Sequence, residues 1–240
     1  MQILYDKIRG LAARLLGIFG LVRDKVSMKA ALARCKQRNL QISTIIDIGA
    51  SDGCWSLMAR KFFPNAHCFL IEAQSSHESA LEKIRSGNTD VDYIISAAGD
   101  RNGSIYFDAA DLFGGLASNS PLGNNCISVP VVTVDSQVRE RNLRPPFLLK
   151  LDTHGFEVPI FEGARETLKD TALIVVEAYN FKLTSESLRF HELCNYMETL
   201  GFRCIDICEP MYRPKDNAFW QMDMLFVPVE RKEFLSNSYE

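Results

Sequence analysis

Residues 44–53 read TIIDIGASDG, and the interpretation of the whole chain starts from this stretch. Three isoleucines within residues 45–48 form a short β-branched run that is typical of a buried strand. Gly49 and Gly53 then bracket a turn, and residues 55–63 have the composition of a helix. A strand, a glycine turn and a helix in this order bring backbone N–H groups and a helix N-terminus to face a nucleotide-like ligand.

A second signal follows 19 residues after Gly53, where residues 68–71 predict another buried strand that ends at Glu72. An acid at the end of the second strand is the usual hydrogen-bond partner of a ribose diol. The loop and Glu72 together therefore predict a site for a ligand that contains a ribose. The alternative is an ordinary strand–helix–strand unit whose glycines serve packing alone.

The glycine loop also restricts the type of ligand. The dinucleotide pattern G-x-G-x-x-G is absent because Ser51 stands at the middle glycine, and no phosphate-binding G-x-x-x-x-G-K-[ST] occurs. Asp47, two residues before Gly49, would repel a pyrophosphate but suits a ligand that carries a cation and an amino group. S-adenosylmethionine, with its sulfonium, α-amino group, ribose and adenine, meets these conditions.

Composition and charge agree with one α/β domain with additions. The chain has 240 residues, of which 47% are hydrophobic. Residues 1–40 carry nine Lys or Arg and two Asp, whereas the other 200 residues carry 18 basic and 28 acidic side chains. An acidic main body argues against a nucleic-acid substrate, because phosphate binding needs a basic surface. The seven cysteines include no C-x-x-C pair, which argues against zinc and indicates reduced thiols in the cytoplasm.

The N-terminal segment, residues 3–22, is apolar but interrupted by charges, which argues against a membrane-spanning helix, and no clean signal-peptide cleavage site follows. The interrupting charges are Asp6, Lys7, Arg9 and Arg14. One helical face would carry Leu11, Leu15, Ile18 and Val22. This helix is expected to pack on the domain or on a second subunit. The alternative is a basic amphipathic helix that places residues 1–25 on an anionic membrane surface.

Beyond this segment, strands alternate with helices, and an antiparallel pair closes the sequence. The predicted helices cover 28–39, 55–63, 76–86, 160–168 and 190–200. The predicted strands cover 45–48, 68–71, 92–98, 104–107, 128–134, 147–151, 173–176, 202–207 and 222–227. This order predicts an α/β, Rossmann-like sheet of seven strands, mostly parallel with an antiparallel C-terminal strand and with helices on both faces. We divide the chain into an N-terminal helical extension (1–42), a ligand-binding domain (43–228) and a tail (229–240).

Two segments after Glu72 are expected to border the ligand. Ala98 ends the third predicted strand and Asp100 follows it, so they are placed to contact an adenine, although Asp100 also suits plain turn chemistry. Residues 111–125 are rich in Gly, Ser and Asn, and they form either a mobile lid or an irregular loop. The predicted S-adenosylmethionine contacts are Asp47, Gly49, Ala50, Ser51, Gly53, Glu72, Ala98 and Asp100.

The fourth strand runs directly into the acidic sequence DTHGFE at residues 152–157, beside the glycine loop. His154 is the predicted base for a methyl transfer, since imidazole exchanges protons near neutral pH. Asp152 is predicted to orient that imidazole, to bind the acceptor hydroxyl or to meet the methionyl end of the cofactor. The alternative for His154 is a locally bonded turn residue. We assign no metal ligand, but Asp152, Glu157 and Glu177 have the hard oxygens that a divalent cation prefers. The other histidines, His67, His77 and His191, are predicted to be structural.

Several of these motifs occur in the order and spacing of one known family. They are residues 47–53 (DIGASDG), Glu72, 97–100 (AAGD), 134–135 (VD), 150–157 (KLDTHGFE), 163–164 (GA) and 176–177 (VE). Over residues 43–228 the chain resembles the FkbM-like S-adenosylmethionine-dependent methyltransferases. The resemblance implies the class I methyltransferase fold and O-methylation of a hydroxyl on a sugar, glycan or natural product. Ser51 departs from the family pattern, which often has Asn there.

Rival interpretations are weaker. An enzyme that methylates nucleic-acid amino groups would have its proline–aromatic run after the fourth strand, but Pro145-Pro146-Phe147 precedes it. A pyrimidine C5 methyltransferase needs a Pro-Cys nucleophile, which the sequence lacks. A non-catalytic binding module in a larger assembly and a NAD-binding oxidoreductase remain as alternatives, and the intact loop and acids argue against both.

Overall fold

The computed structural model describes residues 25–112, 114–121, 126–185 and 187–239. The predicted helix at residues 3–22 lies outside this part of the chain, as does the membrane contact proposed for it. Within the described residues, none of the helices combines the length and apolar composition needed to cross a bilayer.

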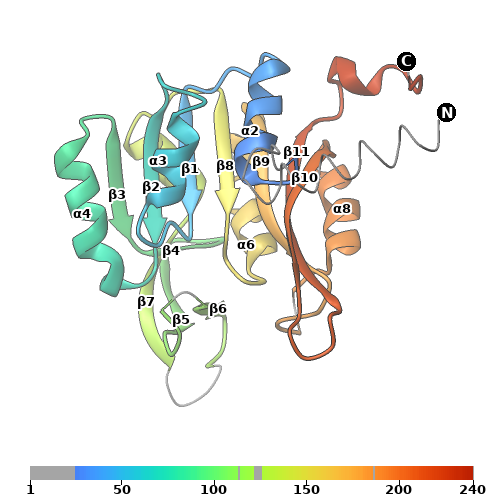
Figure 1. Ribbon diagram of the computed structural model, residues 1–240. Helices are drawn as coiled ribbons and strands as arrows, with labels where there is room; N and C mark the ends of the chain where they lie inside the picture. The colour runs from blue at the N-terminus through green and yellow to red at the C-terminus, as the bar shows by residue number, and fades with distance from the viewer. Residues whose placement is uncertain (1–24, 113, 122–125, 186, 240) are drawn as a thin grey trace, which may run out of the picture.

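The core of the fold is a seven-stranded sheet in the order β10-β11-β9-β8-β1-β2-β3 (Figure 1). Its strands are β1 Thr44–Ile48, β2 His67–Glu72, β3 Val91–Ile95, β8 Phe147–Leu151, β9 Thr171–Tyr179, β10 Phe202–Tyr212 and β11 Phe219–Pro228. The five strands from β9 to β3 are parallel, whereas β11 runs antiparallel to both β9 and β10. The predicted fold class is therefore confirmed.

Helices cover both faces of this sheet. They are α2 Met28–Gln37, α3 Cys54–Arg60, α4 Glu78–Gly87, α5 Val134–Glu140, α6 Glu157–Glu162, α7 Arg165–Leu168 and α8 Phe190–Thr199, with short 3₁₀ turns η1 Ser75–His77 and η2 Lys232–Phe234. Successive side chains of a strand point to opposite faces of the sheet. Ile45 therefore packs in the apolar layer between the sheet and helices α2, α3 and α4. Ile46 and Ile48 enter the opposite layer, with α5, α6 and α8.

A second, four-stranded sheet has the order β4-β7-β5-β6 and lies beyond the carboxyl ends of the main strands (Figure 1). Its strands are β4 Ala97–Ala98, β5 Gly103–Asp108, β6 Leu116–Ser118 and β7 Cys126–Val132. The single strand predicted at 92–98 is thus divided between two sheets. Ser96 marks the division, where its Oγ donates to the carbonyls of Ala97 (3.0 Å) and Pro130 (3.0 Å).

Two further predictions about secondary structure were wrong in detail. Val134 was expected to end a strand, but it begins α5, because the Thr133 side chain accepts a hydrogen bond from the Ser136 N–H (3.1 Å) and caps the helix. The single helix predicted at 160–168 is broken into α6 and α7 at Gly163. A Cβ on Gly163 would lie 1.9 Å from the Gly99 carbonyl oxygen, so only glycine allows this close approach.

Candidate active site

A cavity of about 410 Å³ opens at the carboxyl ends of β1, β2, β8 and β9, where the ends of parallel strands meet at one edge. Six of the predicted site residues line it: Gly49, Ser51, Glu72, Ala98, Asp152 and His154. The structure therefore brings the glycine loop and the acidic fourth-strand end to the same space.

Glu72 links the glycine loop to the next strand. Its Oε2 accepts a hydrogen bond from the Ser51 N–H and its Oε1 accepts one from the Gln74 N–H, both at 2.7 Å. Ser51 itself has a φ of +49°, which turns its N–H toward this carboxylate. Because a carboxylate has about four acceptor positions, each oxygen of Glu72 keeps one for a ligand hydroxyl.

Asp47 lies behind the loop and does not line the cavity. Its side chain is fully buried, and its two oxygens face Ser56 Oγ (2.7 Å) and Lys150 Nζ (3.2 Å). Burial raises the pKa of Asp47, and the charge of Lys150 opposes this effect. The predicted direct contact of Asp47 with a cationic ligand is thus not present in this geometry, because the carboxylate is already paired with a lysine.

Lys150 was not among the predicted site residues, although a lysine in the otherwise apolar strand FLLKL is a visible signal. It is buried, and its Nζ lies 3.1 Å from Asp152 Oδ2 and donates to the Gly49 carbonyl (3.2 Å). Burial would lower the pKa of Lys150, but the two carboxylates together raise it. The Lys150 ammonium group thereby joins the glycine loop after β1 to the segment that follows β8.

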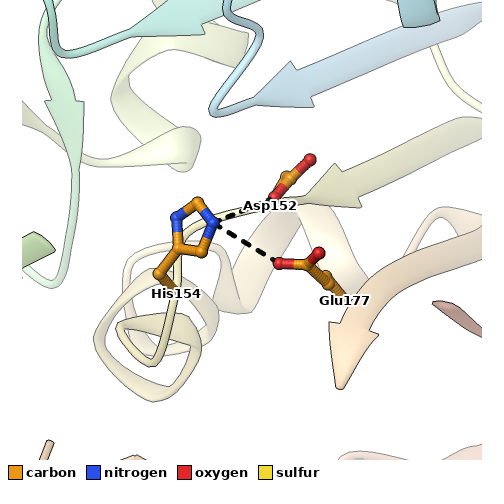
Figure 2. Close-up of side chains that lie close together, drawn as sticks. All are labelled: Asp152, His154 and Glu177. Carbon is orange, nitrogen blue, oxygen red and sulfur yellow. Dashed lines mark ion pairs between the residues drawn. The ribbon is translucent and has the colours of Figure 1, made fainter. Parts of the chain in front are cut away.

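Three side chains converge at the ends of β8 and β9, as Figure 2 shows. The Nε2 atom of His154 lies 3.8 Å from Asp152 Oδ1 and 3.6 Å from Glu177 Oε2. His154 has a φ of +53°, and Gly155 after it has a φ of +101°, so a tight turn returns the imidazole over the strand ends. His154 thus lies near both carboxyl groups, and the role of Asp152 toward it stays a prediction.

The acidic side chains around His154 differ in their surroundings. Burial and the nearby charge of Asp152 raise the pKa of Glu177 to about 8, and the same causes raise that of Asp223 to about 7. For Asp152 burial acts in the same direction, but the charge of Lys150 holds its pKa below the usual value. Tyr179 and Gln221 each donate a hydrogen bond to Glu177. Burial thus favours the protonated forms of Glu177 and Asp223, whereas Lys150 favours the ionised form of Asp152.

Glu157 does not belong to this group, although it was considered as a cation ligand with Asp152 and Glu177. Its Oε1 accepts hydrogen bonds from the Gly155 N–H (2.8 Å) and Thr153 Oγ1 (3.2 Å). Glu157 is buried at the start of α6, where it holds the turn that carries His154.

At the opposite end of the cavity, Ala98 is part of the lining but Asp100 is not. The Asp100 side chain is 43% exposed and pairs with Arg101 (3.0 Å), because the chain turns away from the cavity after Ala98. Ala50 and Gly53 also lie outside the lining, and a Cβ on Gly53 would meet Ile84 at 2.9 Å. Gly53 therefore provides helix packing.

Gln74 and His77 line the cavity and were not predicted as site residues. Gln74 Nε2 donates to the carbonyls of Asp111 (3.1 Å) and Leu112 (3.0 Å), and His77 Nε2 lies 2.9 Å from the Leu112 carbonyl. These contacts hold the segment after β5 beside the cavity, where Phe107 and Leu112 supply apolar surface. Nothing in the sequence pattern indicates this arrangement, since it depends on contacts between distant segments.

The charges in the lining are of one sign. Among the described residues that border the cavity, the acidic ones are Asp52, Glu72, Asp152 and Glu177, and none is Lys or Arg. Such a cavity attracts a cationic ligand and repels a pyrophosphate. This geometry favours a sulfonium ligand over a dinucleotide.

Comparison with known proteins gives one family. Residues 47–204 match the family described as the methyltransferase FkbM domain. The fold is similar to that of methyltransferase FkbM from Methylobacillus flagellatus KT, with 15% identity and a TM-score of 0.50. That alignment covers 76% of this chain and 43% of the other, so this chain spans less than half of that protein.

Two other solved structures are similar at lower scores. An uncharacterized protein from Listeria monocytogenes serotype 4b has 14% identity and a TM-score of 0.49, with 84% of this chain and 68% of the other covered. A putative O-methyltransferase from Klebsiella pneumoniae has 13% identity and a TM-score of 0.48, and the alignment covers 87% of this chain and 84% of the other. No curated protein matches the sequence.

Proposed function

The chain belongs to the FkbM methyltransferase family, and on this premise we propose that it transfers a methyl group from S-adenosylmethionine to a hydroxyl of a sugar, glycan or natural product. The observation that carries the proposal is the cavity between Glu72 and His154, which is lined by four acidic side chains and, among its described lining residues, by no Lys or Arg. We also propose residues 43–228 as the catalytic domain, with α2 packed on it and residues 229–240 as a tail.

The cavity fits the proposed donor in size and in chemistry. Its volume lies within the range of about 300–1,000 Å³ that is common for small-ligand sites. We assign the ribose to Glu72, the loop contacts to Gly49 and Ser51, and the adenine side to Ala98. Asp47, Ala50 and Gly53 support this loop from behind. The donor, when bound, supplies a methyl group on a sulfonium, whose carbon–sulfur bond breaks as the acceptor oxygen bonds to that carbon.

His154 is the proposed proton acceptor for the acceptor hydroxyl. A neutral alcohol is a poor nucleophile, so the oxygen must lose its proton as the new bond forms. Transfer of that proton to Nε2 creates an imidazolium between Asp152 and Glu177, and the Asp152 carboxylate stabilises the new charge. Asp152 thus has the role of orienting and stabilising His154, and Glu177 assists from the neighbouring strand.

A second hollow of about 340 Å³ supports a hydroxyl-rich acceptor. It adjoins the first cavity, with which it shares Ala117 and Phe156. Most of its other lining residues are polar: Asp108, Ser118, Ser120, Thr184 and Ser185. Hydroxyl side chains can donate to and accept from the several hydroxyls of a sugar, which agrees with the acceptor class proposed here.

Replacement of His154 by glutamine is expected to reduce kcat by about 10²–10⁴-fold, the usual contribution of a general base. Transfer of a radiolabelled methyl group to a panel of sugars and glycosides measures this. Affinity for S-adenosylhomocysteine, measured by calorimetry, should change by less than about twofold, since His154 is assigned to the acceptor. His191→Gln on α8 is the matched control, and its turnover should be normal. Normal turnover of the His154 variant would remove the base assignment.

Replacement of Glu72 by glutamine is expected to weaken S-adenosylhomocysteine binding by about 10–100-fold, because charged hydrogen bonds are lost. An amide can accept at only one of the two positions where the N–H groups of Ser51 and Gln74 now donate, so the loop also loses support. Glu78→Gln, on the exposed start of α4, is the control and should bind normally. Unchanged calorimetric affinity in the Glu72 variant would contradict the ribose assignment.

A further inference from the structure

We propose that Asp152, His154 and Glu177 form a binding site for a divalent metal cation at the acceptor end of the cavity. Each residue offers one ligand atom, and these atoms all lie within 4.8 Å of one another. All three residues line the cavity, so a cation held by them would keep open positions on the side where an acceptor enters. The inference rests on the proposed function, because it concerns how the acceptor hydroxyl of that reaction is activated.

The distances from His154 to the two carboxyl groups are longer than hydrogen bonds. His154 Nε2 is 3.6 Å and 3.8 Å from the facing carboxylate oxygens, beyond hydrogen-bond distance in both cases. Metal–ligand distances of about 2.0–2.2 Å place neighbouring ligands roughly 3 Å apart. Side-chain adjustments of less than about 1 Å would therefore bring all three atoms around one ion. Figure 2 shows that the imidazole and both carboxylates point toward a common space.

Outer hydrogen bonds hold the ligands in this orientation. Lys150 Nζ contacts Oδ2 of Asp152 and leaves Oδ1 directed at His154. The hydroxyl of Tyr179 and the amide of Gln221 donate to Glu177 from the other side. Such outer partners commonly orient metal-binding side chains. In this chain they come from three strands, β8, β9 and β11, and so fix both carboxylates independently.

The donor set indicates the class of metal. Two carboxylates favour hard cations such as Mg²⁺ and Mn²⁺, and an imidazole extends the range toward transition metals. Mn²⁺ satisfies both preferences. Asp152 and Glu177 supply the two carboxyl ligands that such an ion prefers, and Asp223 on β11 is paired with Glu177 on β9.

A bound cation would change one step of the proposed reaction. The acceptor hydroxyl would coordinate the ion, which lowers the pKa of the hydroxyl, and its proton would pass to a water molecule in the cavity. His154 would then act as a ligand through Nε2 and not as the proton acceptor. Proton transfer to His154 and activation of the hydroxyl by a cation use the same three residues, but only the second requires a bound metal.

Titration with MnCl₂ tests the site on the full chain after treatment with EDTA and dialysis. The electron paramagnetic resonance signal of free Mn²⁺ should show one bound ion per chain at micromolar concentration. Glu177→Gln and His154→Gln should each weaken binding by at least about tenfold, since each loses a ligand. Tyr179→Phe removes only an outer partner and should weaken it about tenfold. Glu82→Gln, which removes an exposed carboxylate from α4, should bind Mn²⁺ like the wild type.

Binding only at millimolar Mn²⁺, or micromolar binding that the Glu177 and His154 variants leave unchanged, would overturn the inference. Calorimetry with S-adenosylhomocysteine on the same metal-free protein separates this result from a failure of the proposed function. Binding of the nucleoside without binding of Mn²⁺ would leave the methyltransferase assignment in place and return His154 to the role of base. Absence of nucleoside binding would count against the methyltransferase assignment whatever the result with Mn²⁺.

Discussion

Replacement of Gly49 by alanine is expected to lower the free energy of unfolding by about 3 kcal/mol or more. Gly49 has a φ of +74°, and an added Cβ would lie 2.0 Å from the backbone carbonyl oxygen of Asp152, closer than real Cβ atoms approach. The backbone fixes the position of the Cβ, and the oxygen that it meets is itself a backbone atom, so no side-chain rotation can relieve the collision. Urea denaturation measures the loss of stability.

The same substitution is expected to weaken S-adenosylhomocysteine binding by at least about 100-fold, because Gly49 begins the loop that carries Ser51 and packs directly on the Asp152 backbone beside the cavity. Gly87→Ala at the end of α4 is the matched control. A Cβ there meets no atom within 4 Å, so stability should rise slightly or stay the same. A Gly49 variant that unfolds and binds like the wild type would show that the two loops are not in contact.

Replacement of Lys150 by methionine is expected to lower the free energy of unfolding by about 3–5 kcal/mol. Asp47 is fully buried, and its Oδ1 has Lys150 Nζ at 3.2 Å as its charged partner. Without the ammonium group, this carboxylate stays in the core with only Ser56 as a hydrogen-bond partner in the described structure. Thermal and urea unfolding measure the effect.

The double variant Asp47→Asn with Lys150→Met separates charge from packing. If an uncompensated charge causes the loss, removal of both charges should restore stability to within about 1 kcal/mol of the wild type. Methyl transfer should stay low in the double variant, because Asp152 and the Gly49 carbonyl also lose their contact with Lys150. Equal stability of the single and double variants would contradict the pairing with Asp47.

Local sequence predicted the elements that bring the site together. The buried run before Gly49, the acid at Glu72 and the alternation of helices with strands each depend on residues close in the chain. The resulting order of parallel strands places Asp152 beside the glycine loop without further information. The prediction failed where local propensity was overruled: Val134 has strand character, but the Thr133 cap makes it the start of a helix.

The roles of the acids depended on contacts that no local pattern contains. Asp47 was expected to face a cationic ligand, but Lys150 from another strand neutralises it. Glu157 and Glu177 are equally acidic in sequence, yet Glu157 supports a turn and Glu177 meets His154. Asp100 follows a strand that ends at the cavity, but its turn leads away to Arg101.

By itself, the sequence determined the family, the order of the sheet and the edge at which a ligand binds, because glycine turns and strand ends are encoded by neighbouring residues. Only the tertiary structure decided which carboxylates are paired and which face the cavity. The charge state and direction of a carboxylate depend on burial and on partners up to a hundred residues away, and folding alone brings those partners together.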